Sequence, residues 1–278
     1  MSERDAGSGV VTGQGGWSRV APDEPGCERI EAFFAGRAYE PHRHDTYAIG
    51  ITLWGVQSFH YRGQRHDSLS GGTIVLHPDE VHDGESGAEG GFQYRMLYIE
   101  PALIQRALGG RRLPYVPDGI SRDPRLRRAS AALLDGIDQQ LSGLEYEDAV
   151  FDLAQALAAV SDDRAPPSAG THDYRAAEVA RAYLDASIDT QVSLADLEAA
   201  VARDRWALSR DFRALYGTSP HRYLVMRRLA RVKAALRAGM SLAESAAEAG
   251  FADQSHMGRH FRRAYGVTPA AWLRLLAA

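Results

Sequence analysis

The chain has 278 residues, of which 45% are hydrophobic and 24% charged, and its formal net charge is −4. This composition excludes a largely disordered chain, a collagen-like chain and a disulfide scaffold, and the length fits one or two domains. With a single cysteine, Cys27, no disulfide can form within the chain. No apolar run approaches the roughly 20 residues that a membrane span needs, and the amino-terminal residues lack the apolar core of a secretory signal. We therefore expect a cytoplasmic protein without a membrane partner.

Charge is divided unequally along the chain. Residues 172–278 contain 16 Lys and Arg against 11 Asp and Glu, whereas residues 1–171 contain 16 against 25. Lys233 is the only lysine, so the basic charge is almost entirely arginine. A basic carboxyl-terminal third on an acidic body predicts one domain that meets a polyanion and one that does not.

Short apolar segments and turn residues alternate in the first hundred residues. Residues 1–16 are glycine-rich and aperiodic, and we expect them to form a flexible tail. Residues 17–100 contain segments rich in Ile, Val, Tyr, Phe and Thr that are separated by Gly, Pro, Asp or His. This pattern predicts strands of a β-barrel or sandwich, with Gly55, Gly63 and Gly72 at turns. The expected strands are 28–35, 47–55, 57–63, 72–78 and 92–100.

The pattern changes to helical spacing after residue 100. Residues 101–160 are rich in Ala and Leu, with apolar residues recurring every three or four positions. These helices either pack onto the β domain or pair across a two-fold axis to form a dimer. The polar, Pro- and Gly-containing residues 161–171 are expected to form a linker. Everything from 172 to 278 reads as helix.

The carboxyl-terminal region contains an internal repeat with an offset of 48 to 49 residues, which indicates a duplicated helix-turn-helix unit. Ser193 and Ser241 are expected to cap the first helix of each unit, with Glu244 completing a capping box and Asp196 as its weaker counterpart. The second helices start after Asp204 and Asp253 and stop at a glycine. A long helix over 219–237 is expected to hold the two units at a fixed separation.

Helical geometry predicts two faces on the second helix of each unit. Leu208, Phe212 and Leu215 form an inward stripe in the first copy, and Met257, Phe261 and Ala264 do so in the second. The opposite faces carry arginine, serine and glutamine, which suit the edges of bases in a DNA major groove; the alternative is that they are ordinary solvated faces. The expected DNA-contacting residues are Trp206, Ser209, Arg210, Arg213, Gln254, Ser255, His256, Arg259 and Arg262.

Successive major-groove faces of B-DNA lie about 34 Å apart on one side of the duplex. Two units joined by a stiff helix are therefore expected to read an asymmetric site in double-stranded DNA with a single chain. Arg222 and Arg227, on the joining helix, are expected to contact phosphate.

Residues 172–278 resemble the DNA-binding domain of AraC/XylS-type transcription regulators. The resemblance is carried by G-F-A-D-Q-S-H-M-G-R-H-F-R-R-A-Y-G-V-T-P at 250–269 and by R-R-L-A-R-V-K-A-A-L at 227–236. It implies base contacts by residues of both second helices, with Gly258 departing from the bulkier residue usual there. It also implies dimerisation by the 123–160 region, a contact with RNA polymerase, and activation of transcription as the commoner role. The positions to which the base contacts carry over are Trp206, Ser209, Arg210, Gln254, Ser255, His256 and Arg259.

Residues 28–100 resemble the cupin-like effector domain of many such regulators, through P-H-R-H-D-T-Y at 41–47 and H-P-D-E-V-H-D-G at 77–84. One interpretation is a pocket for a small polar effector; another is that the histidines only cap strands and hydrogen-bond to carbonyl groups. His60, His66 and His77 are expected at exposed or turn positions. The expected effector-binding residues are His42, His44, Tyr47, His82 and Tyr94.

His42, His44 and His82 are also the residues that could bind a metal ion, because two histidines that are two apart on a strand share a face. Catalytic cupins usually add a glutamate soon after the second histidine, and here Asp45, Thr46 and Tyr47 follow. No cofactor is therefore expected, and no catalytic residue is assigned.

The sequence as a whole predicts an α+β multidomain protein that is not an enzyme. A cupin-like β-barrel or sandwich with flanking helices would bind an effector, and an all-α domain with two helix-turn-helix units joined by a long helix would bind DNA. The alternative is a metal-dependent cupin enzyme, such as a dioxygenase or isomerase, that carries a DNA-binding domain. A further alternative is a β domain that serves only for oligomerisation.

Overall fold

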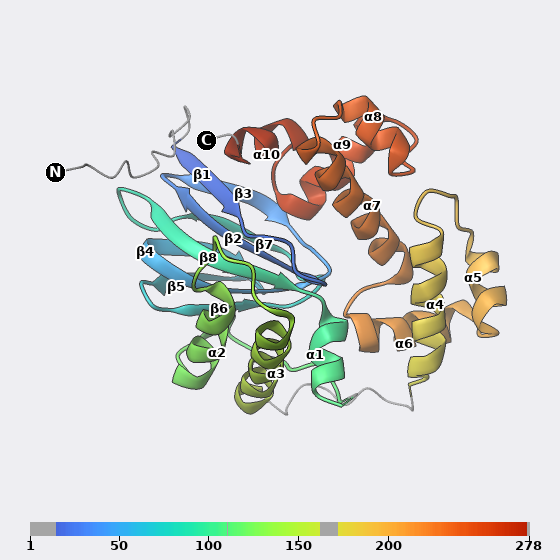
Figure 1. Cartoon of the computed structure of the whole chain (residues 1–278), viewed down its shortest axis with the longest axis horizontal. Helices are drawn as coiled ribbons and strands as arrows, with labels where there is room; N and C mark the ends of the chain where they lie inside the picture. The colour runs from blue at the N-terminus through green and yellow to red at the C-terminus, as the bar shows by residue number, and fades with distance from the viewer. Residues whose placement is uncertain (1–14, 110, 162–171, 277–278) are drawn as a thin grey trace.

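The amino-terminal part of the chain folds as an antiparallel sheet that curls on itself (Figure 1). A computed structural model describes residues 15–109, 111–161 and 172–276. Within them the strand order is β1–β2–β8–β4–β6–β9, with β5 beside β4 and with β7 pairing with both β3 and β4. The bounds are β1 Gly16–Val20, β2 Cys27–Phe34, β3 Arg37–His42, β4 Tyr47–Tyr61, β5 Gln64–Leu69, β6 Thr73–Leu76, β7 His82–Ser86, β8 Phe92–Ile99 and β9 Ile120–Ser121.

The expectation of a turn at Gly55 is wrong, because this glycine lies inside one 15-residue strand, β4. The register of β4 against β8 shifts between Thr52 and Trp54, and Gly55 follows with a φ of 75°. A Cβ at this position would collide with the carbonyl oxygen of Gly91 on the neighbouring chain segment. Glycine therefore permits a bulge that bends the strand, so β4 can pair with β8 and β6 at one end and with β5 and β7 at the other.

The two faces of β4 serve two different apolar cores. Tyr47, Ile49 and Ile51 point outward into a cluster shared with the helices that follow the sheet, whereas Ala48 points into the interior of the barrel. This division follows from the alternation of side chains along a strand. The helices are α1 Pro101–Ala107, α2 Pro124–Leu134 and α3 Gly143–Val160. Residues 101–160 thus pack onto the sheet within the chain, and dimerisation through this region stays a prediction.

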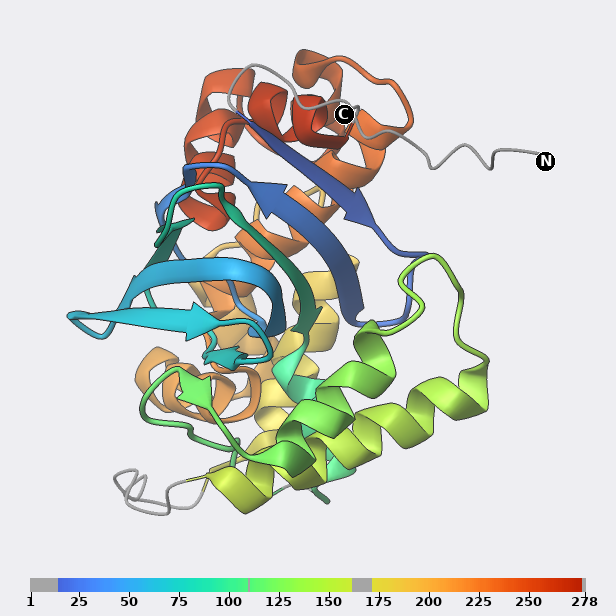
Figure 2. The same ribbon diagram turned by 90° about the vertical axis from the view of Figure 1, so that its left-hand side faces the viewer.

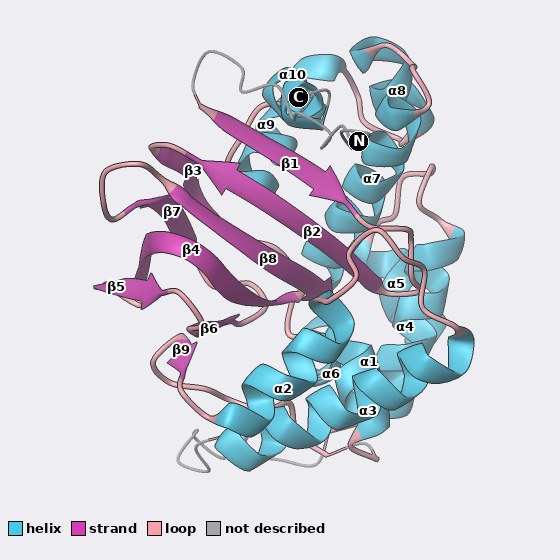
Figure 3. Cartoon of the chain, turned by 60° about the vertical axis from the view of Figure 1, so that its left-hand side comes forward, coloured by secondary structure: helices cyan, strands magenta, loops and turns pink. Residues whose placement is uncertain are grey.

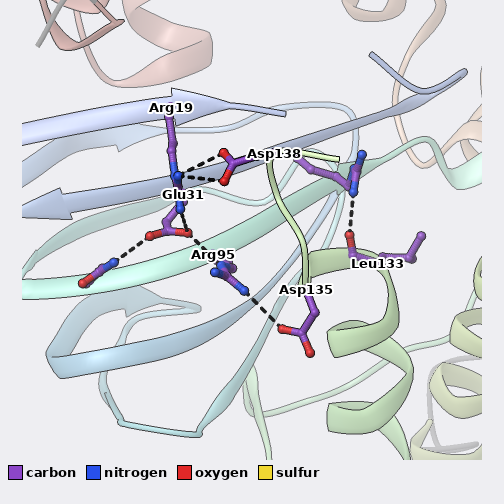
Figure 4. Close-up of polar contacts among 8 residues, drawn as sticks. Arg19, Glu31, Arg95, Leu133, Asp135 and Asp138 are labelled. Carbon is purple, nitrogen blue, oxygen red and sulfur yellow. Dashed lines mark hydrogen bonds and ion pairs between the residues drawn. The ribbon is translucent and has the colours of Figure 1, made fainter. Parts of the chain in front are cut away.

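A network around a buried carboxylate connects the sheet to the end of α2 (Figure 4). Glu31 on β2 accepts hydrogen bonds from Arg19 (2.8 Å), Arg95 (2.8 Å) and Gln93 (2.6 Å). Burial acts to raise the pKa of Glu31, but these three donors outweigh it and the pKa is lowered. Arg95 also pairs with Asp135 at the end of α2, at 3.1 Å. The network connects three strands to the helical layer.

The carboxyl-terminal part is all-helical, as the repeat predicts. The first unit packs its apolar side chains against α4 and the start of α7, and the second packs against the rest of α7. Helix α7 thus supplies Leu224 to one core and Leu229 to the other, which joins the two units through a single helix. The bounds are α4 Tyr174–Ala186, α5 Leu194–Val201, α6 Arg205–Tyr216, α7 Pro220–Arg237, α8 Leu242–Glu248, α9 Gln254–Tyr265 and α10 Pro269–Leu276.

The predicted helix ends of the repeat are confirmed. Ser193 and Ser241 cap α5 and α8, and each forms a complete capping box with the acidic residue three positions on. Asp196 thus completes its capping box as Glu244 does, because its carboxylate accepts a hydrogen bond from the Ser193 amide at 2.9 Å. Asp204 and Asp253 cap α6 and α9. The predicted inward residues of both helices are buried.

The two parts of the chain lie in contact. Helices α7, α9 and α10 lie along the side of the sheet opposite to α2 and α3 (Figure 2), so the β domain is between two helical layers (Figure 3). Most of the expected tail 1–16 and of the expected linker 161–171 lies outside the described residues, although β1 already begins at Gly16. Across the described ranges, no helix has both the length and the apolar character needed to cross a membrane.

Candidate DNA-reading surface and interdomain cavity

The outward face of α6 is open to solvent, as the sequence predicts. Arg210 and Arg213 are exposed, Ser209 is half-buried, and Trp206 is 72% exposed at the first turn. Arginine, serine and tryptophan on one exposed helical face are suited to phosphate, to base edges and to thymine methyl groups.

On the outward face of α9, one of the residues predicted to be exposed is not. Gln254, Ser255 and Arg259 are exposed. His256 is half-buried instead, with its Nε2 atom 3.0 Å from the Nε2 atom of His260. Burial and the neighbouring His256 lower the pKa of His260 to about 4, and the two rings share a hydrogen bond. In this structure His256 is thus engaged within its own helix.

Arg213 and Arg262, two of the predicted DNA contacts, pair with the β domain in this structure. Arg262 binds the carboxylate of Glu40 on β3 at 2.5 and 2.7 Å, and Arg213 lies 3.7 Å from Asp79. Both arginines keep more than half of their side-chain surface exposed. They occupy equivalent positions of the repeat, so each unit meets the β domain at the same place on its second helix.

The expectation that Arg222 and Arg227 contact phosphate is wrong for this arrangement. Both are largely buried between the domains. Arg222 binds Asp79 at 2.6 Å, and Arg227 binds Asp45 at 2.9 Å and also pairs with Glu100. Burial lowers the pKa of Arg222 and raises that of Asp45. These ion pairs join α7 to the β domain.

The only lysine of the chain lies farther along the same helix. Lys233 binds Glu28 of β2, with its Nζ atom 2.6 Å from Oε1, and Arg237 reaches the same carboxylate at 3.1 Å. Burial acts to raise the pKa of Glu28, but these two cations outweigh it and the pKa is lowered. The Lys233 ammonium group also lies 5.5 Å from the centre of the Trp272 ring.

A cavity of about 360 Å³ separates the β domain from α7, α9 and α10. Its walls are mostly apolar, formed by residues such as Ile30, Met226 and Trp272. The charged groups that line it are Asp23, Glu24, Glu28, Asp45, Glu100, Arg227, Lys233 and Arg237. Carboxylates thus outnumber cations, and all three cations already have carboxylate partners.

Three buried histidines meet at one end of this cavity. His42 and His82 are cross-strand partners on β3 and β7, and His44 follows β3. The His82 ring centre lies 4.3 Å from that of His42 and 4.8 Å from that of His44. Burial lowers the pKa of all three, to about 4 for His42 and about 3 for His44, so the rings are neutral at pH 7. His42 and His44 line the cavity, and His82 lies behind them.

The other two predicted effector residues are not brought to the cavity. Tyr47 faces the outer helices and donates to the carbonyl oxygen of Pro114 at 2.8 Å, because strand alternation turns it away from the barrel interior. Tyr94 is inside the barrel and is screened from the cavity by Tyr39, 2.5 Å away between the two hydroxyl oxygens.

His77 is buried and not in an exposed turn, since it accepts from the amide of Val116 at 3.0 Å. Sequence reasoning missed Lys233 and Glu28 as cavity residues. The presence of a single lysine in an arginine-rich chain was the signal available for Lys233.

Comparison with known proteins agrees with this architecture. Residues 24–154 match the family model of the AraC-like ligand binding domain, and residues 197–275 match that of a helix-turn-helix domain. The chain is an AraC-type transcription regulator. The family to which these matches belong is one of transcription regulators and not a family of enzymes.

Among the relatives of this AraC-type chain is the uncharacterized HTH-type transcriptional regulator YbfI of Bacillus subtilis strain 168. The two are 24% identical over 235 residues, which is 82% of this chain and 86% of YbfI. ToxT from Vibrio cholerae O395 has a similar fold, with a TM-score of 0.65, 12% identity, and coverage of 92% of this chain and 100% of ToxT. A ToxT structure with bound unsaturated fatty acid has a TM-score of 0.59 at 12% identity, covering 94% of each chain.

Proposed function

We propose that this regulator reads duplex DNA with α6 and α9 and that a ligand in the interdomain cavity controls the reading. The main support is the pair of matched, capped helices with apolar inner faces and exposed outer faces. In this proposal residues 17–100 and 101–160 form the effector part and residues 172–278 the DNA-binding part. The DNA-contacting residues are Trp206, Ser209, Arg210, Arg213, Gln254, Ser255, His256, Arg259 and Arg262.

Arg213 and Arg262 give this proposal a mechanism. A side chain that pairs with Asp79 or Glu40 is not free to contact DNA, so the arrangement seen here withholds one arginine of each unit. A ligand that binds one arrangement of the domains better than another shifts the population toward it. We propose that the effector acts by changing how α7, α9 and α10 lie on the β domain.

The first test is Arg259→Ala, measured by gel shift on duplexes selected from a random pool by the wild-type protein. Loss of a contact to a base edge should cost about 1–3 kcal/mol of specific binding and relax the sequence preference at one position. Arg128→Ala, an exposed arginine on α2, is the charge-matched control and should bind like the wild type. Unchanged specific affinity of Arg259→Ala would remove this residue from the reading surface.

The effector is proposed to be a small molecule with an apolar body and one polar end. The apolar walls favour the body, and the Lys233–Glu28 pair can meet a polar end. ToxT structures contain an unsaturated fatty acid or a naphthalenyl butenoic acid. A carboxylate of that kind would have to displace Glu28 from Lys233 here, because each cation at the cavity already has an acidic partner.

Ala230→Trp tests whether the cavity is the effector site. Ala230 is exposed on α7 and lines the cavity, so an indole there should fill it without removing a core side chain. An unsaturated fatty acid should raise the Tm of the wild type and leave that of the variant unchanged. An equal shift in both proteins would place the ligand elsewhere.

We further propose that the protein works as a homodimer that contacts RNA polymerase. Leu144 and Phe151 on α3 are 75% and 50% exposed, which supports pairing through this helix. Phe151→Asp should shift the sedimentation coefficient toward that of a single chain. A wild type that sediments as a single chain at all concentrations would reject the dimer.

A further inference from the structure

The arrangement of hydrogen bonds around His42, His44 and His82 distinguishes these residues from ordinary core histidines. Each ring donates from Nδ1 to a backbone carbonyl oxygen two residues away: His42 to Glu40 at 2.8 Å, His44 to Thr46 at 3.0 Å and His82 to Glu80 at 3.0 Å. The same local bond therefore fixes the same tautomer in all three rings. Each ring keeps a lone pair on Nε2.

These lone pairs have no donor in the described part of the chain. The Nε2 atom of His44 is buried and makes no hydrogen bond there. Each histidine can place one ring nitrogen within 4.8 Å of those of the other two. Three neutral acceptors that face one another without a donor are an unfavourable arrangement unless something positive or protic lies between them.

A first-row transition-metal ion would satisfy these acceptors once the rings close in from their spacing of up to 4.8 Å to the roughly 3.4 Å that Zn–N bonds of about 2.0–2.1 Å allow. Imidazole is a preferred ligand of Zn²⁺ and its neighbours in the row, and metal-binding histidines almost always donate the other ring N–H to a carbonyl or carboxylate. The local charge also favours a cation, because carboxylates outnumber cations around the adjoining cavity. Asp45 and Glu100 pair with Arg227 and do not belong to the histidine cluster.

We propose that the Nε2 atoms of His42, His44 and His82 bind one divalent transition-metal ion, with Zn²⁺ as the fitting ion. Three histidine ligands leave the fourth position of a tetrahedral site free. His42 and His44 line the interdomain cavity, so a bound ion would lie beside the space in which the effector is proposed to bind. The glutamate that catalytic cupins usually add after the second histidine is absent here, and three histidines are a sufficient set of protein ligands without it.

The site is coupled to the second helix-turn-helix unit through β3. A Cβ added at Gly266, which ends α9, would lie 2.9 Å from the Nδ1 atom of His42 and 2.7 Å from the carbonyl oxygen of Glu40. The amide of Glu40 also donates to the carbonyl oxygen of Gly266 at 3.2 Å. The carbonyl group that orients His42 thus belongs to the residue that holds Arg262. A bound ion would fix this end of β3, and it would therefore also fix the surface that the end of α9 contacts.

The closing experiment measures Co²⁺ and Zn²⁺ binding by chelator-treated full-length protein. The wild type should bind one Co²⁺ per chain, with visible absorption typical of a four-coordinate ion, and Zn²⁺ should displace it. His82→Ala and His44→Ala should lose saturable binding. His60→Ala, an exposed histidine outside the cluster, should keep it. A wild type without saturable binding, or triad variants that bind as the wild type does, would overturn the proposal.

A second measurement does not depend on how the variants fold. X-ray absorption at the zinc edge of the loaded wild type should show scattering from three imidazole rings, and fewer than three would overturn the assignment. The coupling to α9 rests on the proposed DNA-binding function and is tested separately, by comparing DNA affinity with and without Zn²⁺. Equal affinities would reject the coupling. A protein that binds Zn²⁺ but no DNA would reject the proposed function and leave the metal site standing.

Discussion

The two helix-turn-helix units have the same framework but present different surfaces. Both begin with a capping box, and both end the second helix at a glycine with a φ of 68°. In the first unit Trp206 lies in solvent at the start of α6, and the end of α6 meets Pro78 and Pro101. In the second unit the end of α9 rests on β3. Duplication has therefore fixed the fold of each unit and left its outer surface free to diverge.

The turns between the paired helices also differ. The first unit turns at Ala202, which has a φ of 51° although it is not glycine. The second turns at Gly250, where a Cβ would approach the backbone of Ile188 and Asp189 to within about 3 Å. The first turn is open to a side chain and bears backbone strain, whereas the second is closed by its neighbours and needs glycine.

The largest expected effect compares the two cores. Phe212 and Phe261 are equivalent in the repeat, and both side chains are fully buried. Phe212→Ala and Phe261→Ala should each lower the free energy of unfolding by about 3–5 kcal/mol, because each leaves a cavity in a packed cluster. Urea denaturation with separate probes for each unit measures both. A loss in one unit only would show that the repeat does not have two equivalent cores.

The next effect concerns the glycines that end the reading helices. Gly266→Ala should cost about 1–2 kcal/mol from the left-handed backbone alone, and its methyl group would also meet the Glu40 carbonyl oxygen. Gly239→Ala is the matched control, since Gly239 has a φ of 88° and nothing within 4 Å of an added Cβ. Hydrogen exchange at residues 40–43 should rise in the first variant only. A rise in both would mean that α9 does not brace β3.

A smaller effect is expected for the ion pair between Arg262 and Glu40. Glu40→Gln removes a carboxylate from Arg262, which lies partly in solvent, so stability should change by at most about 1 kcal/mol. Asp79→Asn is not equivalent, because it also leaves the largely buried Arg222 without its partner. DNA affinity should nevertheless rise in Glu40→Gln, because Arg262 is released. If gel shifts show no gain in this variant, the pairing does not withhold Arg262.

The smallest effect is a change with pH. The pKa of Glu28 is lowered in the folded protein from its ordinary value of 4.5, so its pairing with Lys233 stabilises the fold above that pH and is lost as the pH falls through the lowered value. The Tm advantage of the wild type over Glu28→Gln should therefore be present at pH 7 and shrink below pH 4.5. An advantage that is independent of pH would mean that the ion pair does not contribute.

Local features of the units could be predicted from the sequence because they depend on neighbouring residues. Caps at Ser193 and Ser241 and the inward stripe of Phe212 follow from spacing within a single helix. The bulge at Gly55 could not be predicted, because its cause is the approach of Gly91 from another strand. A turn and a bulge use the same residue type and differ only in which segment lies alongside.

The candidate site could be predicted only in part, for a similar reason. His42 and His44 share a face by strand geometry, and His82 joins them by cross-strand pairing. The sequence predicts Tyr47 in the effector pocket, but its side chain lies on the opposite face of β4. Which face it takes depends on the residue at which β4 begins. The engagement of Arg222 and Arg227 by the β domain joins residues more than 120 positions apart, which no local pattern contains.

Lys233, described above as the partner of Glu28, makes the junction between the domains chemically unique. No other side chain in the chain carries a primary amine, and this one is only 8% exposed while the domains are closed. An amine-reactive dye can therefore attach to one side chain, that of Lys233, in addition to the α-amino group. The rate of acylation at Lys233, resolved by peptide mapping, should report how often the junction opens, without introducing a foreign residue.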